Sequence, residues 1–169
     1  MRFTLLLILI SITSFNALAQ QDSTEKTTVT LAMLYNSNVS YYGQTTNEKL
    51  PYVLSNATVR FPIGLYLSAG AYKLLNYGSG LSETDIGIGY DHNFNEKINT
   101  TLAYTRSFFP ANSPLLQASN ENNINLSINY AWKWLKSSLS TDYAFGKEND
   151  IFLCLAHSKE IKIGSLFNE

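Results

Sequence analysis

The chain of 169 residues is poor in charge, in cysteine and, after its first residues, in long apolar runs. Asp, Glu, Lys and Arg make up only 15% of it, against about 25% in ordinary soluble domains. The net charge of −1 offers no basic excess, so nucleic acid is not expected as a partner. The single cysteine, Cys154, excludes an intramolecular disulfide and a cysteine-based metal site. Phosphate-loop, HExxH and EF-hand motifs are also missing, so no cofactor is expected.

The first residues have the features of an export signal. Arg2 supplies a positive charge, residues 3–12 are mainly apolar, and Ala17-Leu-Ala19 matches the small-residue pattern that signal peptidase accepts. The apolar run is much shorter than the roughly 20 residues that a membrane-spanning helix needs. We therefore predict a cleavable signal peptide over residues 1–19, followed by a flexible N-terminus over residues 20–26. Because Gln20 and not cysteine follows the site, a lipid-modified N-terminus is excluded.

What the chain does have is aromatic residues (13%) and a regular alternation of apolar and polar side chains. The alternation is clearest over residues 124–132, where Ile, Leu, Ile, Tyr and Trp fall on one face of an extended strand and Asn, Ser, Asn and Ala on the other. Seven further segments repeat it: residues 29–35, 53–61, 65–72, 85–91, 98–105, 138–145 and 151–156. This predicts about eight strands, each near the 9–11 residues that suffice to cross a membrane.

The expected connections alternate in length. Residues 36–50, 76–83, 109–121 and 146–150 form the longer ones, and residues 62–64, 93–96 and 134–136 the tight turns. Outer-membrane barrels have short periplasmic turns and longer extracellular loops. We therefore predict an all-β fold, an antiparallel up-and-down transmembrane β-barrel over residues 27–169, located in the cell outer membrane. Aromatic residues near the strand ends are expected to form two girdles at the membrane surfaces.

Five charged residues are predicted to face the interior of this barrel: Arg60, Asp85, Asp91, Lys133 and Asp142. Unpaired charges are costly in a narrow interior, so these residues are expected to form a structural network. Asp85 and Asp91 lie on one strand about 20 Å apart, at roughly 3.3 Å per residue, which is too far for a catalytic pair. No catalytic, cofactor-binding or metal-binding residue is therefore expected, and the chain is not expected to be an enzyme.

Two alternatives remain open at this point. One is a soluble secreted or periplasmic β-barrel whose apolar faces turn inward to bind an apolar ligand. The other is an outer-membrane lipid hydrolase, with His92 and His157 as its only candidate bases; His157 and Ser158 are adjacent and so point to opposite faces of a strand. Within the outer membrane, structural, adhesive and small-pore roles are all compatible with the pattern. The expected partners are the lipid bilayer and the outer-membrane insertion machinery, with the oligomeric state left open.

Residues 107–123, with Trp132-Lys-Trp134 and residues 143–150, resemble an uncharacterised family of outer-membrane β-barrel proteins of Gram-negative bacteria. The resemblance covers roughly residues 82–169. It implies location and fold, and it carries no catalytic motif. Members of that family run on past the stretch that matches residues 163–169. Here Phe167 is followed by Asn168 and Glu169, so either eight strands close with an unusual tail or the chain is a truncated part of a larger barrel.

Overall fold

The computed structural model describes residues 26–45, 48–111 and 113–160; the predicted signal peptide lies outside these residues. They form one antiparallel sheet in which each strand pairs with its neighbours in the chain. The strands are β1 (Thr28–Asn36), β2 (Tyr52–Arg60), β3 (Leu65–Leu74), β4 (Glu83–Asn93), β5 (Ile98–Phe108), β6 (Asn122–Ala131), β7 (Lys136–Phe145) and β8 (Asn149–Ser158). A 3-10 turn, η2 (Leu116–Ser119), precedes β6. The predicted all-β, up-and-down order of eight strands is confirmed.

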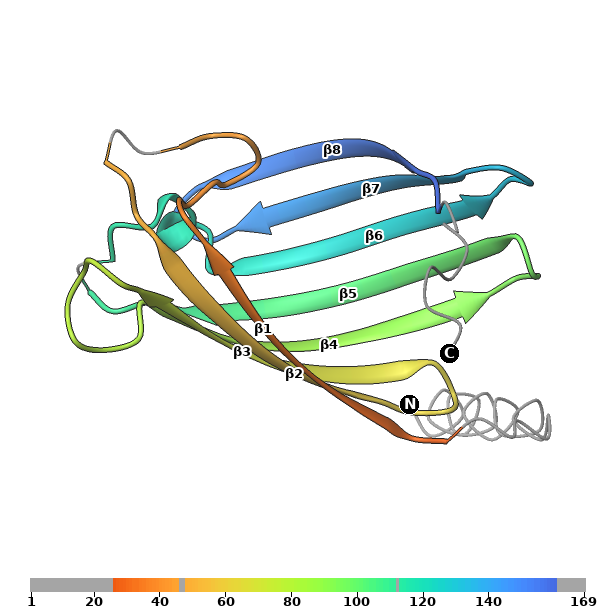
Figure 1. The fold of residues 1–169 in the computed structure, drawn as a ribbon, viewed down its shortest axis with the longest axis horizontal. Coiled ribbons are helices and arrows are strands. Elements are labelled where there is room, and N and C mark those ends of the chain that lie inside the picture. The colour runs from red at the N-terminus through yellow and green to blue at the C-terminus, as the bar shows by residue number, and fades with distance from the viewer. Residues whose placement is uncertain (1–25, 46–47, 112, 161–169) are drawn as a thin grey trace, which may run out of the picture.

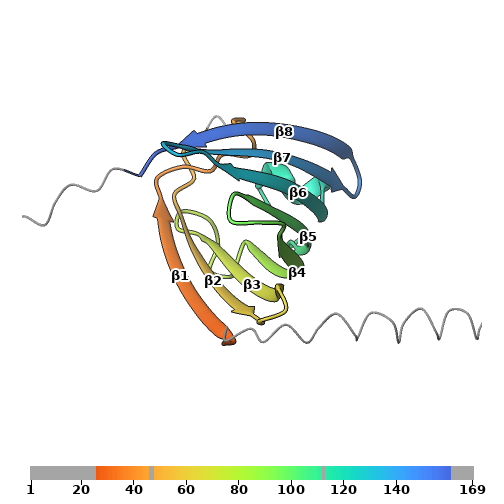
Figure 2. The ribbon, with the colours of Figure 1, turned by 90° about the vertical axis from the view of Figure 1, so that its right-hand side faces the viewer.

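The sheet is strongly curved but does not close. Figure 1 shows the eight strands side by side, and Figure 2 shows the sheet curling into a trough with β1 at one edge and β8 at the other. Within the described residues, no backbone pairing joins β1 to β8. The structure therefore shows an open sheet, and barrel closure is not among its features.

The strand register makes one face of the sheet apolar and the other face polar. Val29 lies opposite Val59, Leu126 opposite Leu102, and Leu139 opposite Leu155, so apolar residues form rows across neighbouring strands on one face. Side chains on this outward face are widely exposed, for example Leu31 (78%) and Ile151 (73%). The intervening residues, mainly Ser, Thr, Asn and Gly, face the concave side. A one-residue slip would exchange the two faces, so the alternating pattern itself fixes the register.

The connections at the two ends of the sheet differ in length, largely as predicted. Tight turns at residues 61–64, 94–97 and 132–135 close one end, and longer connections at residues 37–51, 75–82 and 109–121 close the other. Gly64, with φ of 87°, is required in the first turn because a side chain there would collide with the carbonyl of Asp91. The seventh connection is shorter than predicted: residues 146–148 suffice, since Asn149 already pairs with Phe145.

The hydrophobic core lies at the long-loop end of the concave face. It consists of Val39, Leu50, Tyr72, Leu74 and Leu115, with Tyr52, Leu54 and Phe109 packed against it. Val39 and Leu50 come from the β1–β2 loop, so this loop folds inward over the sheet. Tyr72 is therefore a core residue and does not belong to an outward girdle. Tyr66 also faces inward, where its ring lies over Gly89. Both rings alternate with outward neighbours along β3, which explains the difference from the predicted girdles.

In the described ranges, none of the helical segments has the length and apolar character needed to cross a bilayer.

Candidate functional site

The concave face is a continuous polar surface at the tight-turn end. Asn129 Nδ2 donates a hydrogen bond to Asn99 Oδ1 (3.2 Å), and Asn99 Nδ2 donates to Asn93 Oδ1 (2.9 Å). These three residues lie opposite one another on β4, β5 and β6. Each amide carries both a donor and an acceptor, so a ladder of amides satisfies itself across neighbouring strands.

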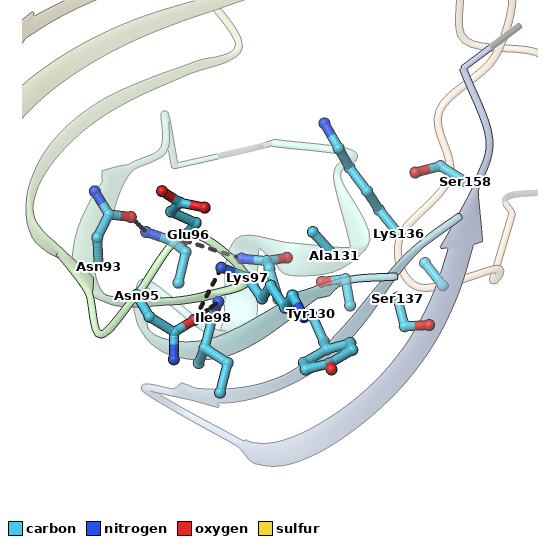
Figure 3. A pocket seen from close by; sticks show the side chains of 14 residues that line it. Asn93, Asn95, Glu96, Lys97, Ile98, Tyr130, Ala131, Lys136, Ser137 and Ser158 are labelled. Atoms are coloured by element: carbon cyan, nitrogen blue, oxygen red, sulfur yellow. Dashed lines mark hydrogen bonds between the residues drawn. The ribbon is translucent and has the colours of Figure 1, made fainter. Parts of the chain in front are cut away.

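A cavity of about 380 Å³ opens beside this ladder. Its walls include Lys97, Lys136 and Glu96, together with Ser, Asn and Ala residues of β5 to β8 (Figure 3). Asn95 holds the adjoining turn, because its Oδ1 accepts hydrogen bonds from the backbone N–H groups of Lys97 (2.8 Å) and Ile98 (2.9 Å). This cavity therefore lies at the tight-turn end of the trough and is lined by side chains of both charges.

Two of the five predicted interior charges meet on the concave face near the tight-turn end of the sheet. Arg60 on β2 forms an ion pair with Asp91 on β4. Thr101 Oγ1 donates a second hydrogen bond to Asp91 (2.7 Å), and the Arg60 guanidinium lies 4.7 Å from the centre of the Tyr66 ring. Arg60, Asp91, Thr101 and Tyr66 therefore form one connected group of contacts on the concave face.

We expect this ion pair to contribute measurably to stability. Arg60 is 45% exposed and Asp91 21%, so the pair falls between exposed pairs, at about 0–1 kcal/mol, and buried ones. A double-mutant cycle of Arg60→Ala and Asp91→Ala, followed by urea unfolding in detergent micelles, should give a coupling energy of about 1 kcal/mol. The comparison is the same cycle on Arg106 and Glu121, a pair of similar exposure outside this group of contacts, whose coupling should be of the same size. Additive effects at Arg60 and Asp91 would contradict the assignment.

The other three predicted charges lie apart from this pair. Asp142 accepts a hydrogen bond from Asn125 Nδ2 (2.8 Å) on the neighbouring strand. Asp85 faces inward beside Gly70, where an added Cβ would lie 3.1 Å from its carboxylate, and its buried Oδ1 has no hydrogen-bond partner in the described part of the chain. Lys133 was placed on a polar strand face, but β6 ends at Ala131 and Lys133 is exposed in the following turn. It is therefore not an interior charge.

The long-loop end holds a feature that sequence reasoning missed. Residues 41–44 form a tight hairpin, closed by hydrogen bonds of 2.9 Å between Tyr41 and Gln44 in both directions. The Tyr42 ring stacks on Phe152 of β8 at 3.6 Å between centroids, and Tyr41 packs edge-on against the same ring. The β1–β2 loop thus crosses to the opposite edge of the sheet. The signal in the sequence was the Tyr41-Tyr42-Gly43 triplet within a polar loop.

Two asparagines fix the hairpin to the sheet. Asn120 Nδ2 donates to the Tyr41 hydroxyl (3.5 Å) and to Asp150 Oδ2 (2.6 Å). Asn123 Nδ2 donates to the Tyr42 hydroxyl (3.4 Å). Burial is the largest cause that raises the pKa of both phenols above the ordinary value, and nearby carboxylates raise it further. The hydrogen bond from Asn120 opposes the shift at Tyr41 without cancelling it, so both phenols stay neutral.

A second cavity, of about 320 Å³, lies beneath this hairpin. We call it the mouth cavity, lined by Ser40, Tyr41, Tyr42, Glu83, Ser107, Asn120, Asn123 and Ala144. Two of these polar side chains are buried: Glu83 is 7% exposed and Asn120 6%. The mouth cavity therefore combines buried polar groups with aromatic rings, the composition of many small-molecule sites.

The outward face carries one serine–histidine contact. Ser137 Oγ lies 2.9 Å from His157 Nδ1 because the two residues are opposite each other on β7 and β8. The same hydroxyl accepts a hydrogen bond from Trp132 Nε1 (2.9 Å). The two ion pairs found among the described residues do not include His157, so the contact lacks the carboxylate that orients the histidine in a Ser-His-Asp triad. His92, the other candidate base, packs against Phe94.

In the part of the chain that the structure describes, His, Cys, Asp and Glu side chains do not gather into a group of three or more that could hold a metal ion. No family model, curated protein or solved structure matches this chain. Its function must therefore be inferred from the geometry of the two faces of the sheet and of the two cavities.

Proposed function

We propose that the chain forms an outer-membrane β-barrel whose apolar outward face contacts lipid and whose polar concave face surrounds a narrow interior. The observation that supports it most is the apolar outward face, on which every strand except β2 carries exposed large apolar residues, such as Leu31, Ile88 and Leu126. A typical soluble monomer exposes apolar patches of only about 300–600 Å². An apolar surface that extends over seven of the eight strands suits a bilayer and would be an aggregation hazard in water.

The proposal includes closure of the sheet. In hydrocarbon, each unpaired backbone group costs several kcal/mol, so the free edges of β1 and β8 must find partners. The 41–44 hairpin supports pairing of the two edges with each other, because it already reaches from the β1 side to Phe152 of β8. We therefore propose that β1 pairs with β8 in the membrane.

An interior of this size supports a structural, adhesive or small-solute role over that of a wide pore. Eight strands enclose a space that side chains largely fill. Here Arg60, Tyr66, Tyr42 and Phe152 project into it. Inward positions carry more acidic residues (Glu83, Asp85, Asp91, Asp142 and Asp150) than basic ones (Arg60 and Lys136). Any solute that enters should therefore be neutral or cationic.

The soluble alternative would need an apolar concave face. In the structure the concave face carries mainly Ser, Thr and Asn, and its apolar side chains are confined to the small core at the long-loop end. This arrangement favours the membrane proposal over a carrier of apolar ligands.

Fractionation tests the location directly. The full chain, expressed with its own first residues in a Gram-negative host, should be found in the outer-membrane fraction and should resist extraction by high salt and alkaline carbonate. A folded barrel should also migrate differently on a gel before and after boiling. Recovery in the soluble periplasmic fraction would overturn the proposal.

A further inference from the structure

Hydrogen bonds connect three side chains on the outward face at its tight-turn end. Trp132 Nε1 donates to Ser137 Oγ (2.9 Å), and Ser137 Oγ lies 2.9 Å from His157 Nδ1. An indole N–H can only donate, so the serine oxygen accepts there, and its own proton finds its acceptor in His157 Nδ1. A neutral histidine whose Nδ1 accepts carries its proton on Nε2. Since Nε2 has no partner among the described residues, His157 presents a free N–H donor on this face.

Aromatic rings lie beside this donor. The Tyr130 and Trp132 rings pack edge to face with their centroids 4.6 Å apart. Tyr130 lies opposite Ser137, which in turn lies opposite His157. Trp132 is 53% exposed, and Trp134, in the turn between β6 and β7, is 67% exposed. Because the rings of Trp and Tyr prefer the headgroup level of a bilayer, His157 Nε2–H lies at headgroup depth in the membrane proposed above.

Basic residues outnumber acidic ones at this end of the sheet. The basic residues are Lys26, Arg60, Lys97, Lys133, Lys136 and Lys159. The acidic residues are Asp91, Glu96 and Glu160, and Asp91 is already paired with Arg60. The tight-turn end therefore has a positive field, which favours an anionic partner.

Two of these lysines lie next to the aromatic rings. Lys133 is exposed in the turn between Trp132 and Trp134. Lys159 is exposed two positions after His157, at the end of β8. The β6–β7 turn and the end of β8 are adjacent, as Figure 1 shows, because the first residue of β7 pairs with the last residue of β8. In the described ranges neither lysine forms an ion pair, so both charges are available to an anion.

We propose that this corner of the outward face binds the headgroup of an anionic phospholipid. We call it the headgroup site, made of Trp132, Lys133, Trp134, His157 and Lys159. His157 Nε2–H donates to a phosphate oxygen, and the two lysines select a headgroup of net negative charge. The exposed tryptophans favour a lipid over a free phosphate, because a soluble anion gains nothing from apolar rings at its side. The inference rests on the proposed membrane location and adds the class of lipid that the tight-turn end contacts.

Tryptophan fluorescence reports on this site alone, because the chain has two tryptophans and both belong to it. The full folded chain would be reconstituted in phosphatidylcholine vesicles that contain a minor fraction of brominated phosphatidylglycerol or of brominated phosphatidylcholine. Bromine on the acyl chains quenches nearby indoles, so the two quenching curves give the relative affinity of the two lipids. Phosphatidylglycerol should be preferred at least about fivefold, which is the contribution of one lysine near an anionic lipid surface.

The outcomes separate this inference from the membrane proposal. Equal quenching by the two brominated lipids would overturn the headgroup site and leave the membrane proposal intact. If neither lipid quenches and the protein stays outside the vesicles, the membrane proposal is wrong and the headgroup site fails with it. Loss of the preference on adding inorganic phosphate at constant ionic strength would identify a site for free phosphate and would overturn the assignment to a lipid.

Paired variants locate the lysines of the site. Lys133→Gln combined with Lys159→Gln removes both charges and should abolish most of the preference for phosphatidylglycerol. The matched control is Lys49→Gln with Lys147→Gln, which removes the same charge at the long-loop end. All four lysines are exposed, so both double variants should fold. An equal loss of preference in the two double variants would mean that net charge alone is responsible and would overturn the site.

The histidine is tested with a lipid pair that differs in the phosphate. His157→Phe keeps an aromatic ring and removes the N–H donor. It should leave the preference for phosphatidylglycerol over phosphatidylcholine unchanged, since both lipids carry a phosphate. It should lower the preference for brominated phosphatidylcholine over brominated diacylglycerol by about threefold, the effect of one lost hydrogen bond. An unchanged preference in this second pair would overturn the role of His157 as the phosphate donor.

Discussion

Replacing Leu126 by arginine should lower the stability of the folded protein in a bilayer by about 2–4 kcal/mol, whereas the same change at the adjacent Ser127 should be tolerated. Leu126 lies in the middle of β6 on the outward face and is 49% exposed. Ser127 points to the concave side, opposite Ser140 of β7. Arginine on the lipid face near the midplane of a transmembrane barrel costs about 2–4 kcal/mol, while an arginine in the lumen can stay hydrated. Urea unfolding of protein refolded into lipid vesicles would measure the difference.

The two positions are neighbours in the chain and undergo changes of equal charge, so they are a matched pair. They differ mainly in the face of the sheet that receives the charge. A soluble protein would give the reverse ranking, because the arginine of Leu126→Arg would lie in water and would improve solubility. Equal stability of the two variants in vesicles, or better behaviour of Leu126→Arg in detergent-free buffer, would therefore contradict the membrane proposal.

Alternation along each strand made most of the fold predictable from the sequence. Positions such as Leu126, Ile128 and Tyr130 define a face whichever strands lie beside them, so strand number, order and orientation followed. The sequence suggested that charged residues on the polar face would pair, because opposite charges in a narrow interior stabilise each other, but it did not show that Arg60 would pair with Asp91. Lys133 was misplaced because periodicity cannot show where a strand ends, and the turn begins just before it. Such boundaries depend on the closing hydrogen bond of Trp132 with Leu135.

The mouth cavity could not be predicted because its residues are far apart in the chain. Tyr41 and Asn120 lie 79 positions apart, and Asn123 meets Tyr42 across 81. Only the curvature of the whole sheet brings the β1–β2 loop over β5, β6 and β8. Loop residues carry no periodic signal. The Tyr41-Tyr42-Gly43 triplet marks a turn with aromatic residues, but it does not show which distant strands the turn contacts. The sequence predicts a closed barrel whereas the structure shows an open sheet, because alternation describes the faces of strands and gives no information about their edges.

Cys154 offers a direct test of whether β1 and β8 pair with each other. It is the only cysteine, it is exposed, and it lies on the concave side of β8 opposite Ser140. In a closed barrel, one inward position of β1 must come within the roughly 4.4–6.8 Å between Cα atoms that a disulfide requires. We therefore expect one of the five inward positions of β1, tested as Thr28→Cys, Thr30→Cys, Ala32→Cys, Leu34→Cys and Asn36→Cys, to form an intramolecular disulfide with Cys154 after mild oxidation in membranes.

This bond should have a large effect on stability. It would enclose roughly 120 residues, which corresponds to about 4–5 kcal/mol in the chain-entropy model. Non-reducing gels and mass spectrometry of the linked peptides would identify it, and urea unfolding before and after reduction would measure the gain. Leu31→Cys is the control on β1, because its side chain points outward and should stay reduced. Disulfide-linked dimers would show that the edges pair between two copies, and free thiols at all five inward positions would show that β1 and β8 remain apart. Either result would contradict closure within one chain.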